Sequence, residues 1–213
     1  MTFRGWPAEA IEFFEGLEAD NSKTYWQQHK AIYDEVVRAP MAALLDAVQP
    51  EFGAGSIFRP YRDVRFSRDK SPYKTQMGAA IGHEQDTVYY VQLSSAGLMA
   101  AAGMHSPAAD QIERFREAVV DERSGSRLVT IVDEVEDAGY QVGGEQLKTA
   151  PRGYPKDHPR IRLLRHKGLY AWKEWAPAKW LGTGKALDRV VETWRGLEQL
   201  NAWLRERVGP TRG

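Results

Sequence analysis

Residues 62–74 combine five cations and two carboxylates in a stretch of thirteen residues. Arginine binds phosphate and carboxylate groups through paired N–H donors, and lysine adds a compact positive charge. A core strand does not suit this composition, because a buried charge without a partner is costly. The stretch therefore predicts a polar site for an anionic ligand. We expect its positive charge to come from Arg62, Arg65, Lys70 and Lys74.

Three further side chains of this stretch have expected roles at the site. Asp63 can hold an arginine in place or accept a proton, while Ser67 and Tyr73 can supply hydrogen bonds. This interpretation predicts an open cleft at Arg65 and Lys70, and it fails if protein carboxylates capture both. The alternative is an internal network of ion pairs that fixes a long loop without any ligand. If the protein is an enzyme, these groups best support electrostatic stabilisation of a developing negative charge.

A second basic stretch, residues 146–167, holds seven cations and one carboxylate. Gly153 lies in the sequence Pro-Arg-Gly-Tyr-Pro, which is typical of a fixed backbone that approaches another group closely. We expect Lys148, Arg152 and Lys167 to complete the anion site from across the fold. The remaining arginines are expected to cover the solvent side of a short helix; these are Arg160, Arg162 and Arg165.

The sequence argues against several other kinds of site. It contains no cysteine, which excludes disulfides, thiolate metal ligands and cysteine nucleophiles. Its five histidines lack the spacing of metal ligands, so we predict no metal site, and no cofactor can be assigned. Residues 182–185 resemble the end of a phosphate-binding loop, but position 179 is lysine and position 186 is alanine. We expect His29 to pack in the core. His105 lies between a predicted strand and a predicted helix, and it is a further candidate for a functional residue.

The charge distribution favours a local anion site over a general nucleic-acid surface. The net charge is zero, although residues 1–58 hold nine anions against four cations. Basic stretches in a neutral chain indicate local recognition, so we expect an anionic small molecule, such as a phosphorylated metabolite or a nucleotide.

Two alternatives for the partner stay open. The basic stretch can instead grip an acidic protein, such as the acidic helices of another copy, and then serve in assembly without catalysis. Tryptophans 172, 175 and 180 can stack on the bases of a weakly bound nucleic acid, although the neutral overall charge counts against this.

The elements that must position these residues begin with a helical first third. Pro7 opens a helix with a periodic apolar face, and residues 20–22 end it and start a second helix. We expect Pro40 to interrupt that second helix and residues 41–48 to resume it, since proline lacks the N–H that a helix interior requires.

The middle of the chain changes to the pattern of strands, which we expect at residues 57–61, 75–81, 87–93 and 98–102. Their short connections predict an antiparallel meander, because parallel strands need long crossovers. Two helices follow, with Phe115 and Val132 on their apolar faces. A hairpin around Gly143-Gly144, a short helix ending near Leu164 and a strand at residues 170–175 complete this part.

The apolar stripe from Ala186 to Val208 predicts one long C-terminal helix. These elements predict a single α+β domain over residues 1–213, with an antiparallel sheet flanked by helices. The first seven residues lack a secretory leader, and the longest apolar run, Leu98–Met104, is too short for a membrane span. We therefore expect a soluble, cytoplasmic protein without a membrane partner.

Two motifs carry a resemblance to a known family. The first, from Phe58 to Thr75, reads Phe-Arg-x-x-Arg-Asp-x-Arg-Phe-Ser-Arg-Asp-Lys-Ser-Pro-Tyr-Lys-Thr. The second comprises Pro151-Arg-Gly-Tyr154, His158-Pro159 and Leu163-Leu164 to Lys167. Together with Asn21 and Trp26 in the amino-terminal helices, they are similar to the domain of unknown function 2461, a family of conserved hypothetical proteins in bacteria and fungi.

The resemblance spans nearly the whole chain. Arg68 departs from the family pattern, in which lysine is expected more often, but the positive charge is kept. The family implies that the two basic motifs belong together. It implies no particular substrate, cofactor or reaction.

Overall fold

The computed structural model describes residues 2–82 and 86–212. The chain forms two compact units. Unit 1 comprises Met1–Ile81, Tyr90–Ala100 and Glu174–Glu192, and unit 2 comprises Gly82–Tyr89, Ala101–Lys173 and Thr193–Gly213. The expectation of a single domain over residues 1–213 stays a prediction. Among the described helices, none is long and apolar enough to span a membrane.

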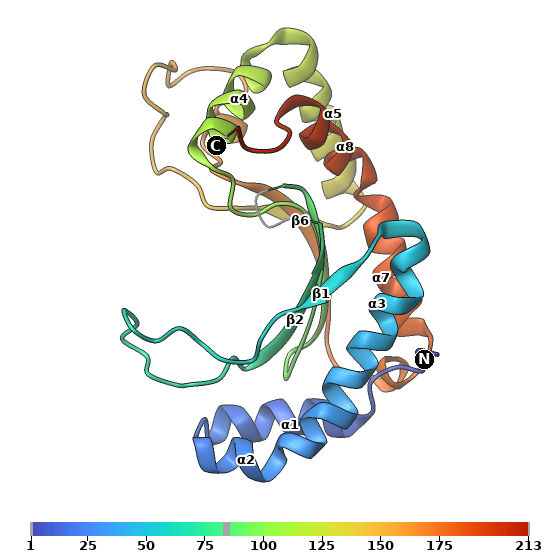
Figure 1. Ribbon diagram of the computed structural model, residues 1–213. Coiled ribbons are helices and arrows are strands. Elements are labelled where there is room, and N and C mark those ends of the chain that lie inside the picture. The colour runs from blue at the N-terminus through green and yellow to red at the C-terminus, as the bar shows by residue number, and fades with distance from the viewer. Residues whose placement is uncertain (1, 83–85, 213) are drawn as a thin grey trace. The chain divides into compact units, whose positions relative to one another are not determined.

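Unit 1 begins with the predicted helices. They are α1 (Ala8–Ala19) and α2 (Lys23–Ile32), and Ser22 starts α2 by accepting the Tyr25 N–H at 3.1 Å. The pair is closely packed, because Gly16 leaves room on α1 for the Tyr25 ring (Figure 1). The buried face of α1 includes the predicted Ile11, Phe14 and Leu17.

Pro40 does not interrupt the second helical run, contrary to the prediction. The run continues through a π-helical segment, Tyr33–Arg38, into α3 (Ala39–Phe52). There the Ala39 N–H bonds the carbonyl of Asp34, five residues back. A widened turn of this kind accommodates the proline ring, which would clash with a carbonyl in a regular helix.

One antiparallel sheet has the strand order β1-β2-β3-β4-β6-β5. The strands are β1 (Gly55–Ile57), β2 (Gln76–Ile81), β3 (Val88–Ser94), β4 (Gly97–Met104), β5 (Gln141–Gly143) and β6 (Leu169–Trp175). The predicted α+β class and the meander are confirmed. The range predicted for the first strand lies too late in the sequence, because β1 ends at Ile57 and Tyr61 makes only an isolated bridge with Tyr73.

Unit 2 packs its helices around a separate core. These helices are α4 (Ala109–Val120), α5 (Glu122–Asp137), the short α6 (Ile161–Leu164) and α8 (Glu198–Arg207). Their core includes fully buried Val119, Leu128, Leu164 and Trp203. It forms because the apolar residues of α4 and α5 recur at helical spacing, as the sequence predicts.

The predicted hairpin around Gly143-Gly144 is wrong. Strand β5 pairs with β6 instead, and residues 145–147 run beside 165–167, with the Leu147 N–H bonding the Arg165 carbonyl at 2.8 Å. Gly144 lies so close to the Gly168 carbonyl that a Cβ would be 1.9 Å from that oxygen. Gly144 therefore provides a close approach to the backbone of Gly168 rather than half of a two-residue turn.

The single C-terminal helix is also wrong, because α7 (Lys185–Gly196) and α8 are separate helices (Figure 1). At the break, the Leu197 N–H is shared between the carbonyls of Thr193 and Trp194, at 3.1 and 3.2 Å. Gly196 lies against the hydroxyl of Tyr140, which is 2.1 Å from the position that a Cβ would take. The apolar stripe continues across the break, and so the pattern alone predicts one helix.

Candidate functional site

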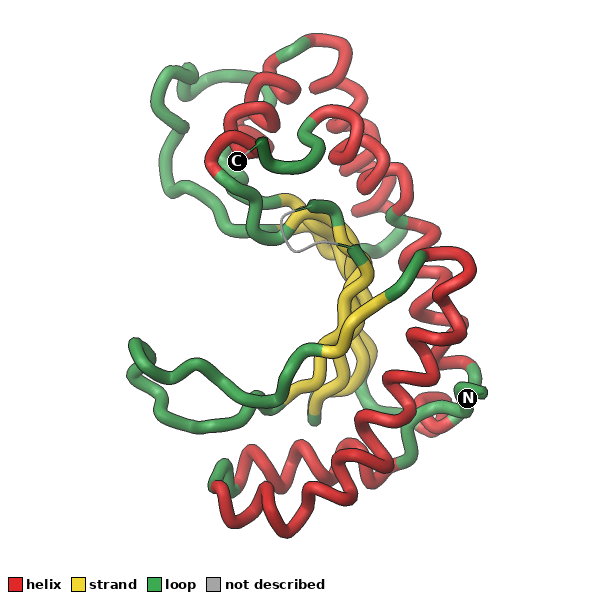
Figure 2. Tube along the Cα trace, viewed as in Figure 1, coloured by secondary structure: helices red, strands yellow, loops and turns green. Residues whose placement is uncertain are grey.

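The first basic motif lies in the long connection between β1 and β2, which we call the basic loop (residues 58–75). Figures 1 and 2 show it extending from the ends of these strands. Its base is closed by backbone pairing, since the Arg62 N–H bonds the Pro72 carbonyl at 2.9 Å and the Lys74 N–H bonds the Pro60 carbonyl at 2.8 Å. This short ladder fixes which residues of the two arms face each other.

The loop base is anchored to the α1–α2 pair by Asn21 and Trp26. Asn21 accepts the backbone N–H of Tyr73 and donates to its carbonyl, both at 3.0 Å. The Trp26 ring stacks on the Tyr73 ring with centroids 4.4 Å apart and 9° between the planes. In the sequence, the two anchoring residues stand out only as part of the family resemblance. Their role depends on contacts such as the one between Asn21 and Tyr73, 52 residues apart, for which no local signal exists.

Tyr73 is buried in this contact, with 5% of its surface exposed. Burial raises the pKa of Tyr73, and the neighbouring Tyr61 adds a smaller increase. The hydroxyl therefore stays protonated near neutral pH. Its observed role is therefore to hold the loop in place. Its expected hydrogen bond to a ligand stays a prediction, as does that of the half-buried Ser67, whose backbone N–H donates to the Val64 carbonyl at 3.3 Å.

Both carboxylates of the loop are used by arginines of the same loop. Arg65 donates from Nε and Nη2 to Asp63, with the shortest contact at 2.7 Å. Arg62 donates to Asp69, which also accepts the N–H and hydroxyl of Ser71 at 2.9 and 2.6 Å. These bonds hold the pKa of Asp69 far below its ordinary value, first through Arg62 and then through Ser71.

Lys70 differs from Arg65, because it donates to the backbone carbonyl of Val64 at 2.9 Å and not to a carboxylate. The condition that would contradict a ligand site, the capture of both cations by carboxylates, is therefore not met. The internal network of ion pairs nevertheless describes Arg62 and Arg65 well. An open cleft at Arg65 and Lys70 stays a prediction.

The loop keeps a surplus of positive charge after this internal pairing. Four of its cations form no ion pair with any residue that the structure describes: Arg59, Arg68, Lys70 and Lys74. Lys74 lies over the Phe58 ring, with its Nζ 5.6 Å from the ring centroid, which stabilises its position without neutralising its charge. The charge of the loop is thus available to a partner.

The second basic motif lies in unit 2, where its arginines contact other elements. Arg160 is buried, and its guanidinium donates to the carbonyls of Val119 and Val120 at 2.8 and 2.9 Å. The expectation that Arg160 covers a wet helix face is therefore wrong, because it closes the turn between α4 and α5. Arg162 is exposed and pairs with Glu136.

The other cations of this motif are arranged in two ways. Arg165 is half-buried and donates to the Leu147 carbonyl at 2.7 Å, while Lys167 forms an ion pair with Glu145. Lys148 and Arg152 are exposed, and neither has a hydrogen bond or ion pair within the described ranges. That Lys148, Arg152 and Lys167 join the basic loop in one site stays a prediction.

Gly153 does not approach another group closely, contrary to the expectation from its two flanking prolines. A Cβ at this position would have nothing within 4 Å, so packing does not require the glycine. The backbone conformation requires the glycine, because its φ is +87° and residues with a side chain rarely adopt such a value.

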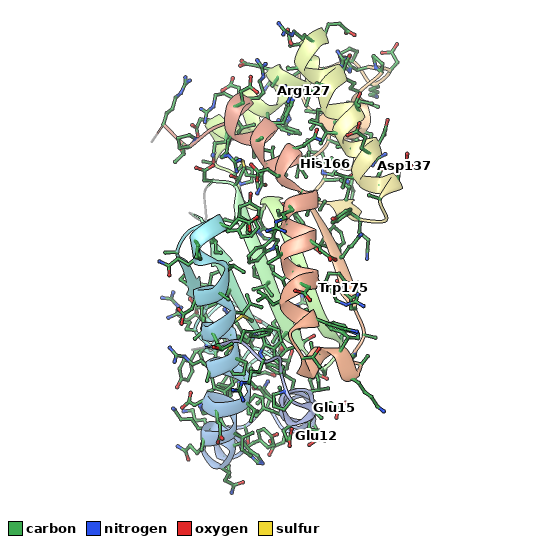
Figure 3. All side chains as sticks on the ribbon, turned by 90° about the vertical axis from the view of Figure 1, so that its right-hand side faces the viewer. Glu12, Glu15, Arg127, Asp137, His166 and Trp175 are labelled. Atoms are coloured by element: carbon green, nitrogen blue, oxygen red, sulfur yellow. The ribbon has the colours of Figure 1, made fainter. Side chains whose placement is uncertain are left out.

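Three of the five histidines occupy different environments. His29 is half-buried rather than fully packed in the core, and stacks on Tyr25 with ring centroids 4.0 Å apart. His105 is exposed, with Nδ1 2.7 Å from the Ser106 hydroxyl. His166 is buried in unit 2, and Figure 3 labels it there. In residues 2–82 and 86–212, no cluster of three metal-ligating side chains occurs.

The fold and this site define an α+β protein whose first two strands are joined by an arginine-rich, anchored loop. The chain belongs to the family described as Conserved hypothetical protein (DUF2461), whose family model matches residues 9–203. The match includes both basic motifs and confirms the resemblance seen in the sequence. Comparison with curated proteins gives no match.

Proposed function

We propose that the basic loop binds a small molecule bearing phosphate or carboxylate groups. The observation that carries this proposal is the surplus of four cations, Arg59, Arg68, Lys70 and Lys74, on a loop whose own carboxylates are already occupied. A pool of unneutralised cations on a fixed segment favours an anion, because charge-assisted hydrogen bonds are about twice as strong as neutral ones.

The internal pairs support binding by orienting the arginines. Asp63 occupies the Nε and Nη2 donors of Arg65 and leaves Nη1 for another acceptor. An arginine held in this way loses less side-chain freedom when a ligand arrives, which lowers the cost of binding. The anchor of Tyr73 to Asn21 acts in the same direction on the backbone.

The electrostatics favour binding or charge stabilisation over proton transfer by the loop. Hydrogen bonds from the Arg65 side chain and backbone lower the pKa of Asp63, which makes this carboxylate a weak base. Asp69 has the same character, because Arg62 and Ser71 stabilise its charged form. We infer that both carboxylates position cations, and that any reaction would rely on the positive charge itself.

The second motif enters the proposal through Lys148 and Arg152, which are exposed and have no partner among the described residues. That they contact the same anion as the basic loop stays a prediction. Because Arg160 already has protein partners, we assign it a structural role. Lys167 pairs with Glu145, and its part in an anion site stays a prediction.

A thermal-shift screen tests the proposal with orthophosphate, pyrophosphate, nucleotides, sugar phosphates and citrate. A ligand present at a hundredfold excess over its dissociation constant adds about 2.7 kcal/mol to the stability of the native state. We expect a shift in wild type that is lost in the double variant Arg68→Ala/Lys74→Ala. Arg127→Ala is the control, since Arg127 is an exposed arginine of α5 (Figure 3) without a partner in the described chain. No shift with any anion, or an equal shift in all three proteins, would contradict the proposal.

A further inference from the structure

The basic loop carries exposed aromatic side chains that a small anion would leave in water. Phe66, at the tip, is 97% exposed, and Tyr61 and Phe58 are 50% and 42% exposed. Arg65 lies beside the Phe66 ring, with its guanidinium carbon 6.0 Å from the ring centroid. Aromatic residues and arginine are the residue types that protein interfaces concentrate. This combination therefore indicates a protein surface as a second partner of the loop.

The charge of the loop specifies the chemistry of that surface. Neither Arg68 nor Lys70 forms an ion pair with a carboxylate of the described residues. The positive tip of the loop therefore favours an acidic partner. Opposite charges across an interface steer the encounter and set the register, while a desolvated aromatic side chain supplies affinity.

Such a surface is present on α1. Glu9, Glu12 and Glu15 are exposed, and none forms an ion pair with any described residue. Their spacing of three residues places them along one side of the helix, with a rise of about 4.5 Å between neighbours. Figure 3 labels Glu12 and Glu15 on α1.

We infer that the tip of the basic loop docks on the acidic face of α1 in a second copy of this chain. The net charge is zero, yet residues 1–58 hold nine anions against four cations and residues 59–74 hold six cations against two anions. Every copy thus carries both complementary surfaces within unit 1. Contacts of this kind join two different patches, so two copies can exchange them reciprocally or form a larger ring.

Sedimentation-velocity ultracentrifugation over a range of protein concentrations tests this contact. We expect wild type to associate at low ionic strength and to dissociate as salt screens the exposed charges, whose interaction range falls to about 3 Å at 1 M salt. Phe66→Ser and, separately, Glu12→Lys/Glu15→Lys should each weaken association about tenfold or more. Glu134→Lys is the control, because Glu134 is an exposed carboxylate of α5 in unit 2, and it should leave association unchanged.

A charge exchange gives the sharpest version of the test. Arg68→Glu alone should abolish self-association, and mixing Arg68→Glu with Glu12→Lys/Glu15→Lys should restore it. A monomeric wild type at all concentrations overturns the inference, as does association that ignores Phe66→Ser or the α1 variants. Circular dichroism confirms that each variant is folded. The inference goes beyond small-anion binding, and the α1 variants separate the two, because they leave the affinity of the loop for pyrophosphate unchanged.

Discussion

The two basic motifs use their cations in opposite ways. In the basic loop the ion pairs are local, joining Arg65 to Asp63 two residues away and Arg62 to Asp69 seven residues away. In the second motif the pairs are long-range, as between Arg160 and Glu122, which are 38 residues apart. Local pairs shape a segment without tying it to the rest of the chain, whereas long-range pairs hold elements together. Similar composition therefore hides a difference between a locally paired loop, where we propose that anions bind, and a structural brace.

The largest effect should come from breaking the brace. Arg160→Ala removes the donors to the Val119 and Val120 carbonyls, and we expect a loss of about 3 kcal/mol in the free energy of unfolding. Urea denaturation measures this value. Arg162→Ala is the matched control, because its pair with Glu136 is solvent-exposed and should contribute less than about 1 kcal/mol. An equal loss in the free energy of unfolding for both variants would contradict the distinction between the buried brace at Arg160 and the surface ion pair at Arg162.

The next effect concerns the anchor of the basic loop. Asn21→Ala removes two hydrogen bonds to the Tyr73 backbone, and we expect a loss of about 2 kcal/mol together with weaker pyrophosphate binding. Calorimetric titration measures the binding. Ser22→Ala provides the control, because it removes the N-cap of α2 at a cost of about 1 kcal/mol without touching the loop. If both variants bind pyrophosphate like wild type, the anchor does not position the site.

A pH dependence should distinguish unit 2 from the basic loop. Burial, with Arg162 and Arg165 adding to it, lowers the pKa of His166 below 6.5, although the Gly168 carbonyl opposes this shift. The unfolded state then binds more protons than the folded state as the pH falls below 6.5, so stability decreases in that window. The contacts agree, since a neutral ring can donate from Nδ1 to Gly168 and accept at Nε2 from Gln146, 3.1 Å away.

Thermal unfolding between about pH 8 and about pH 5.5 should therefore show, in wild type, a decrease that is reduced in His166→Gln. An unchanged pH slope in this variant would show that His166 is not the titrating group.

The smallest effect should come from the local pairs. A double-mutant cycle on Arg62 and Asp69 should give a coupling of about 1 kcal/mol or less in stability, because both side chains are partly exposed. Urea denaturation of the two single variants and the double variant provides it. A coupling of several kcal/mol would make the loop a structural clamp like the second motif.

Much of the fold was predictable because it depends on local patterns. The apolar spacing in α1, α4 and α5, and the short connections between β2, β3 and β4, are readable from neighbouring residues. Two of the errors occurred where a distant partner decides. Gly196 breaks the last helix against Tyr140, and Gly144 packs on Gly168 instead of forming a turn.

The candidate site follows the same division. Composition alone shows that residues 62–74 are unusual. It does not show which arginine forms an ion pair with each aspartate. The anchor between Asn21 and Tyr73 and the burial of Arg160 depend on contacts 52 and 41 residues apart. The sequence also does not predict that Phe66 is exposed. An aromatic residue between basic residues shows no periodic pattern that would indicate whether it faces solvent.

We propose that anions bind at the basic loop and not at the braced part of the second motif. The most direct measurement is a two-dimensional ¹⁵N–¹H NMR titration of the assigned protein with pyrophosphate. The predicted result is a saturable set of shifts centred on residues 59–74, with Arg160 and its neighbours in α4 and α5 unaffected. Shifts centred on Arg160 and Lys167, or no saturable shifts in the loop, would contradict it.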